Sequence, residues 1–199
     1  MPHRTAARAA LAAGSAAVLL AACGQEPIHH SASPPAPVST YVAHGVTVEL
    51  PTGWYHAEGS LTPHLVDPRE TVAIATYPLH YRPTRCAHVA GSALEDLGPG
   101  DAFITLQERG RDPGGSWSGF PDRPEHFGAQ LGGPSEAADC VPTAHFTDHW
   151  FGFSDRLRHF HVEVAFGPQA SAATRQEAWA ILDHARVDPQ VVPDWPSSG

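Results

Sequence analysis

The stretch from residue 158 to residue 166 reads RHFHVEVAF and has the clearest strand pattern in the chain. From His159 onward, polar and apolar side chains alternate, and a period of two is typical of a half-buried β-strand. One face then carries His159, His161 and Glu163. The other face carries two phenylalanines and two valines, and it must face the core.

The segment just before this strand has a similar pattern. Residues 143–153 are predicted to form a second strand, and Ser154, Asp155 and Arg156 separate it from the next one. Two such runs joined by a short polar linker are typical of a β-hairpin. With residues 154–156 as the loop, His149 is expected to lie opposite His161.

In that register the polar face of the hairpin is rich in metal-ligating residue types. Imidazole and carboxylate groups close together are suited to Zn²⁺ or Cu²⁺. The candidate ligands are His149, His159, His161 and Glu163. The alternative is an ordinary solvated or hydrogen-bonded strand face, and a slip of one residue would separate the histidines. No cofactor is indicated beyond this candidate site.

The rest of the pattern predicts a mixed α+β fold. Further strands are expected at 46–50, 71–77 and 103–107, and helices at 85–97 and 171–186, from their apolar periodicity and end signals. We therefore expect an antiparallel β-sheet of about five to six strands, with a central helix and a C-terminal helix packed on it. Residues 110–139 are rich in Gly, Pro, Asp and Ser and are expected to form a long loop.

Three cysteines occur in the chain. Cys23 ends an apolar run, which leaves Cys86 and Cys140 as a pair. In an oxidising compartment two cysteines most simply form one structural disulfide. The alternative is two buried thiols.

The N-terminus has the features of an export signal. Two arginines precede an apolar run that ends in the sequence VLLAACG at residues 18–24. The run is too short to span a bilayer but suits a signal peptide. Its end resembles a bacterial lipobox, which implies cleavage before Cys23 and a lipid on that cysteine. We therefore expect a signal peptide at 1–22, a lipidated, disordered tether at 23–40 and a single globular domain at 41–199.

The composition indicates the type of genome that encodes the chain and argues against nucleic acid as a partner. The chain contains no lysine and no asparagine, and all twelve basic residues are arginine. Lysine and asparagine codons are A-rich, so this bias indicates a GC-rich genome and an actinobacterium-like source. The formal net charge of -9 repels phosphate backbones and argues against nucleic-acid binding.

The order of elements also resembles a known fold family. An early strand ending in Pro51-Thr52-Gly53-Trp54, followed later by a hairpin and a C-terminal helix, looks like the PsbP/Mog1-type fold. The resemblance covers roughly residues 44–187. Small exported actinobacterial lipoproteins with no assigned activity are similar too. This resemblance implies roles in binding and assembly rather than one chemistry.

These patterns favour a binding role over catalysis. We expect a module anchored by lipid at the extracytoplasmic face of the cell membrane, where it binds a protein or an envelope ligand. One alternative is a cell-envelope hydrolase with a site in the loop 110–139. The other is a metal-binding lipoprotein that uses His149, His159 and His161. The chain has no phosphate loop, dinucleotide fingerprint or nucleophile elbow.

Overall fold

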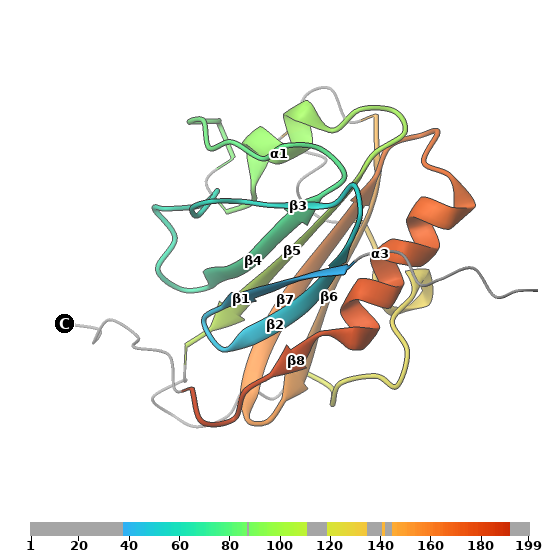
Figure 1. The fold of residues 1–199 in the computed structure, drawn as a ribbon. Helices are drawn as coiled ribbons and strands as arrows, with labels where there is room; N and C mark the ends of the chain where they lie inside the picture. Colours follow the sequence, from blue (N-terminus) through green and yellow to red (C-terminus); the bar gives the residue numbers. More distant parts are fainter. Residues whose placement is uncertain (1–37, 87, 111–118, 135–140, 142–144, 192–199) are drawn as a thin grey trace, which may run out of the picture. The chain divides into compact units, whose positions relative to one another are not determined.

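The structure is a computed structural model, and it describes residues 38–86, 88–110, 119–134, 141 and 145–191. All of these lie in one compact unit, Pro35–Gly199. The expected signal peptide, Cys23 and most of the expected tether lie outside the described residues. The described part is an α+β fold with two antiparallel sheets, as Figure 1 shows. The predicted fold class is therefore confirmed.

The larger sheet has five strands, and each neighbouring pair in it is antiparallel. Its strands, in spatial order, are β3 (Tyr55–His56), β4 (Arg69–Ala75), β5 (Ala102–Arg109), β7 (Arg158–Phe166) and β6 (Thr147–Asp155). The predicted strands at 71–77, 103–107 and in the hairpin are all present. Only the two-residue β3 was not expected.

A second, three-stranded sheet was not expected. It contains β1 (Val38–Ala43), β2 (Val46–Pro51) and β8 (Arg186–Val187), in the order β1-β2-β8. The predicted tether is wrong in its last three residues. Val38 pairs with Pro51 and Thr40 pairs with Glu49, so the strand starts before the predicted boundary. Pairing with β2 supplies the backbone hydrogen bonds that a polar segment lacks on its own.

The C-terminal helix is confirmed as α3 (Ala172–His184). It begins as predicted at Ser171, whose hydroxyl accepts a hydrogen bond from the Thr174 backbone N–H at 3.0 Å. The structure also contains a short 3-10 turn, η1 (Ala129–Leu131).

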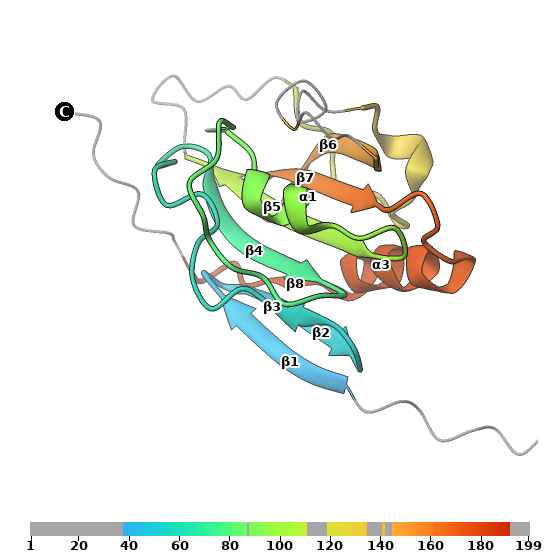
Figure 2. The same cartoon turned by 90° about the horizontal axis from the view of Figure 1, so that it is seen from above.

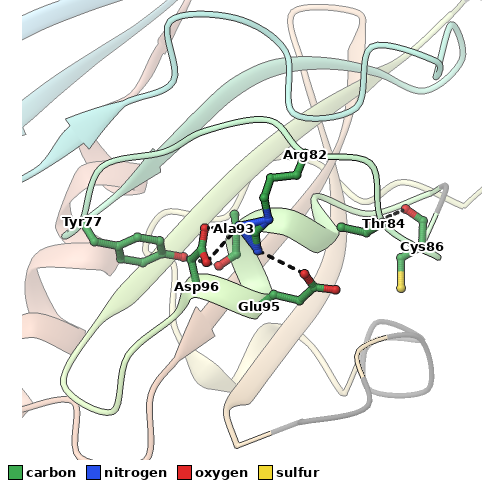
Figure 3. Close-up of polar contacts among 7 residues, drawn as sticks. All are labelled: Tyr77, Arg82, Thr84, Cys86, Ala93, Glu95 and Asp96. Carbon is green, nitrogen blue, oxygen red and sulfur yellow. Dashed lines mark hydrogen bonds and ion pairs between the residues drawn. The ribbon is translucent and has the colours of Figure 1, made fainter.

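The central helix is much shorter than the predicted 85–97. It is α1 (Gly91–Asp96), and Ala90 before it offers no side chain to cap it. The Thr84 hydroxyl donates to the Cys86 carbonyl, and the chain reaches α1 through turns instead of a helix. Figure 3 shows Arg82 bound to Glu95 and Asp96 at the end of α1. Such local side-chain bonds hold the segment without the missing helical turns.

The hairpin turn differs from the predicted loop at 154–156. Asp155 pairs with Arg158, so the turn has only two residues, Arg156 and Leu157. Their φ angles are +50° and +64°. Positive φ at both central positions is typical of the type I′ turn, which matches the twist of the flanking strands. Neither residue is the glycine or asparagine that marks this turn in a sequence.

The shorter turn shifts the hairpin register by three positions. His149 pairs with Val164 and not with His161, which pairs with Gly152. Because side chains alternate between faces, an odd shift moves every residue of one strand to the opposite face. The predicted pairing of His149 with His161 is therefore wrong, and Trp150 lies on the face where His149 was expected.

Both faces of the five-stranded sheet are covered. Figure 2 shows β1, β2 and α3 on one side of this sheet and α1 on the other. The first side holds the larger apolar cluster, which includes Phe160, Val162, Phe166 and Leu182. The second side holds a smaller cluster around Phe103 and Leu94. The polar face predicted for β7 is therefore largely buried and not solvated.

Candidate functional site

Three of the four candidate ligands share one face of β7, as the alternation predicted. His159, His161 and Glu163 lie on the side of the sheet that α1 covers, and Glu163 is fully buried. The Oγ atom of Ser154 and Nδ1 of His159 are hydrogen bonded at 2.8 Å. His159 is thus engaged by its cross-strand neighbour, and this favours the hydrogen-bonded alternative for it.

His149 does not join them. Its ring lies on the opposite face, 5.6 Å from the Trp179 ring and 6.2 Å from the Phe166 ring. Across the described ranges, no three His, Cys, Asp or Glu side chains are grouped closely enough to hold a metal ion. The predicted ligand set is therefore divided between the two faces of the sheet by the register.

Cys86 is buried, and 3 % of its surface is exposed. It packs in the smaller apolar cluster, near Val89 and Ala90. Cys140 lies outside the described residues. The disulfide between Cys86 and Cys140 therefore stays a prediction.

A cavity of about 390 Å³ lies at one end of the α1-covered face. Strands β5, β6 and β7 each contribute to its wall, and the segments before β4 and α1 and the loop 119–134 complete it. Its lining residues are Pro68, His88, Val89, Gln107, Arg109, Pro134, Trp150 and His161. A volume in this range fits a small molecule. The wall is mostly apolar or uncharged, with one arginine.

The chemical state of His161 follows from its partner. Arg109 Nε donates a hydrogen bond to His161 Nε2 at 3.2 Å. Since an arginine can only donate, Nε2 accepts, and the ring is the neutral tautomer with its proton on Nδ1. Burial, followed by the positive charge of Arg109, lowers the pKa of His161 to about 4. Nδ1 is buried and has no hydrogen-bond partner within the described part of the chain.

Gln107 lies directly across from His161 in the β5–β7 pairing. It is 1 % exposed, and its Nε2 lies 3.5 Å from the His88 carbonyl oxygen. A carbonyl only accepts, so this contact orients the amide nitrogen toward His88. The remaining atom, Oε1, is buried without a hydrogen-bond partner among the residues described. A buried polar atom in this state costs about 1–3 kcal/mol.

Aromatic rings enclose His161. The Trp150 ring stacks on it with centroids 5.1 Å apart, and Phe120 meets it edge-on at 4.9 Å. Gly152, which pairs with His161, leaves room for Phe120, because a Cβ there would lie 2.6 Å from its ring. The imidazole is thus packed between two aromatic rings.

Sequence reasoning found His161 but missed its neighbours Gln107, Arg109 and Trp150. Gln107 and Arg109 continue the alternation of the strand predicted at 103–107, so their shared face was visible. That this face lies beside His161 depends on the pairing of β5 with β7. Trp150 lies on this face because of the observed hairpin register, which differs from the predicted one.

We predict that His161 stays neutral down to about pH 4. The unfolded chain takes up this proton near pH 6.5. Folded stability therefore declines as pH falls through the window from about 6.5 to 4. Imidazole ¹⁵N shifts measured against pH should show the Nδ1-protonated ring throughout that window. In Arg109→Met the pKa should rise but stay below 6.5, since burial is the larger cause. A ring that titrates near 6.5 in the unaltered protein would contradict the prediction.

Comparison of the chain with protein-family models gave no match, and neither did comparison with curated proteins. Among the described residues, no helix combines the length and the apolar character needed to cross a bilayer. The site is therefore interpreted from its own chemistry.

Proposed function

We propose that this protein is a lipid-anchored binding module of the bacterial cell envelope, and that it holds a small ligand in the cavity between β5, β6 and β7. The observation that carries the proposal is the pair of buried polar atoms at the cavity wall, Gln107 Oε1 and His161 Nδ1. Natural proteins satisfy nearly all such atoms, and exceptions cluster where a ligand or water binds.

The neutral state of His161 supports binding over catalysis. A general base must be able to take up a proton near the working pH, and a pKa of about 4 makes His161 a poor one at neutral pH. Its hydrogen bond from Arg109 also occupies the nitrogen that would take the proton. Trp150 and Phe120 contact the ring on two sides and limit how far it can reorient, as suits a hydrogen-bond donor of defined direction.

The anchor rests on the sequence leading to Cys23. Two acyl chains give stable membrane attachment where one chain does not. We predict that Cys23→Ala moves nearly all of the protein from the membrane fraction to the soluble fraction. Cys86→Ala is the matched control and should stay with the membrane, because that residue lies in the folded domain. Fractionation followed by immunoblotting measures both. Retention of Cys23→Ala at the membrane after a carbonate wash would contradict the anchor.

Binding is tested with the purified full chain. The protein is incubated with the low-molecular-weight fraction of an envelope extract, re-isolated and analysed by mass spectrometry. A small molecule should co-elute with the unaltered protein and be lost with Trp150→Ala, which opens the cavity wall. Leu157→Ala is a suitable control because this residue is 84 % exposed, lies in the turn between β6 and β7, and does not line the cavity. Equal recovery with all three proteins would contradict binding in the cavity.

A further inference from the structure

The two partnerless atoms in the cavity wall have opposite hydrogen-bonding character. His161 Nδ1 carries a proton and is a donor, because Arg109 occupies Nε2. Gln107 Oε1 is an acceptor, because Nε2 is directed at the His88 carbonyl. The two residues are direct cross-strand partners, and such pairs have Cβ atoms roughly 4.5–5.5 Å apart. The wall thus offers one donor and one acceptor side by side.

We propose that the Gln107–His161 pair recognises the edge of a cyclic amide, a lactam or imide whose N–H donates to Gln107 Oε1 and whose carbonyl accepts from His161 Nδ1. This inference rests on the proposed function. In a cyclic amide the N–H and C=O lie on the same edge, so one rigid group satisfies both atoms.

The surroundings favour this neutral, flat group over a charged one. An ammonium group has no acceptor for the His161 donor and would meet the positive charge of Arg109. A carboxylate has no donor for Gln107 Oε1. The apolar part of a ring would lie among Pro68, Val89 and Pro134, which also line the cavity.

Both atoms belong to side chains that line the cavity, and each has almost no exposed area. The terminal torsions of glutamine and histidine are broad and soft, so small rotations bring the atoms to the surface. The protein has already removed these atoms from water during folding. The ligand therefore gains hydrogen bonds without that desolvation cost at the protein side.

The test uses three six-membered-ring probes with the purified full chain. δ-Valerolactam has the donor and the acceptor, N-methyl-δ-valerolactam lacks the donor, and cyclohexane carboxylate is charged. Binding is measured by NMR titration of the Trp150 indole and His161 imidazole signals. We expect δ-valerolactam to bind at least tenfold more tightly than the other two, because an unmet buried acceptor is costly.

Variants assign the contact to the pair. Gln107→Met keeps the length of the side chain and removes the acceptor, so it should abolish the preference for δ-valerolactam over its N-methyl form. His161→Phe keeps the ring against Trp150 and should weaken all carbonyl probes. If either variant fails to fold, the comparison of the two lactams in the unaltered protein still tests whether the cavity recognises the N–H of a cyclic amide.

The possible outcomes distinguish a failure of the cyclic-amide inference from a failure of the proposed binding function. Preference for δ-valerolactam at the cavity signals supports both. Cavity binding with equal affinity for the two lactams, or with preference for the carboxylate, overturns the cyclic amide and leaves the binding function standing. Absence of any shift at Trp150 and His161 with all three probes overturns the cyclic amide. Co-elution of a small molecule in the extract experiment would then still support the binding function.

Discussion

Replacing Arg158 with alanine is expected to lower the free energy of unfolding by about 3–5 kcal/mol. The guanidinium forms a bidentate ion pair with Glu108, at 2.7 and 2.8 Å, and the two side chains are only 7 % and 2 % exposed. Its removal leaves the Glu108 carboxylate buried without its cation. Arg158 also donates to the His44 carbonyl at 2.8 Å, which joins the β6–β7 hairpin to the turn between β1 and β2.

Urea or thermal unfolding of the full chain measures this loss. Arg156→Ala is the matched control, because this neighbouring arginine is 59 % exposed and its nearest carboxylate oxygen, on Asp155, is 3.9 Å away. Its effect should stay within about 0.5 kcal/mol. The double variant Arg158→Met, Glu108→Leu should recover much of the loss, since no charge is then buried. Similar stabilities for Arg158→Ala and Arg156→Ala would show that the buried pair contributes little.

Replacing Phe166 with alanine is expected to cost about 3–5 kcal/mol and to loosen α3. The Phe166 ring is 1 % exposed and meets Trp179 of α3 with ring centroids 5.7 Å apart. The Arg175 guanidinium lies over the Phe166 ring, 4.6 Å from the ring centroid. The substitution leaves a cavity and removes the ring through which β7 contacts Trp179 and Arg175 of α3.

Two readouts check this prediction. Unfolding gives the loss of stability, and the indole N–H signal of Trp179 in an NMR spectrum should shift as its ring loses the contact with Phe166. Phe166→Leu keeps most of the volume and should lose clearly less stability. Leu157→Ala removes an apolar side chain that is 84 % exposed and should change neither signal. An unchanged Trp179 indole signal in Phe166→Ala would contradict the role of the Phe166 ring in docking α3.

Elements with strong local patterns were predictable. The alternation in β7 placed His159, His161 and Glu163 on one face, and Ser171 marked the start of α3 correctly. The central helix was overestimated because a few apolar residues at helical spacing are also compatible with turns. Cys86, Val89 and Ala90 pack in the apolar cluster on this face without forming a helix, and only Gly91–Asp96 became helical.

The site itself depends on pairings between distant segments. Gln107 and His161 are 54 positions apart, and they meet because β5 and β7 are neighbours in the sheet. Their burial depends on α1 and its preceding segment covering that face. The sequence of one strand specifies neither this pairing nor this burial. The period of two predicts which residues share a face, but it does not predict which residues of another strand lie across from them.

By itself, then, the sequence determined the α+β class, the strand faces, the C-terminal helix and the export-type N-terminal pattern, since each follows from local periodicity and local signals. The tertiary structure decided the register of the hairpin. A two-residue turn at Arg156 and Leu157, both with positive φ, replaced the expected loop at 154–156 and moved His149 away from His161. The physical reason is that turn geometry and burial of both sheet faces select the register, and an odd shift exchanges the faces completely.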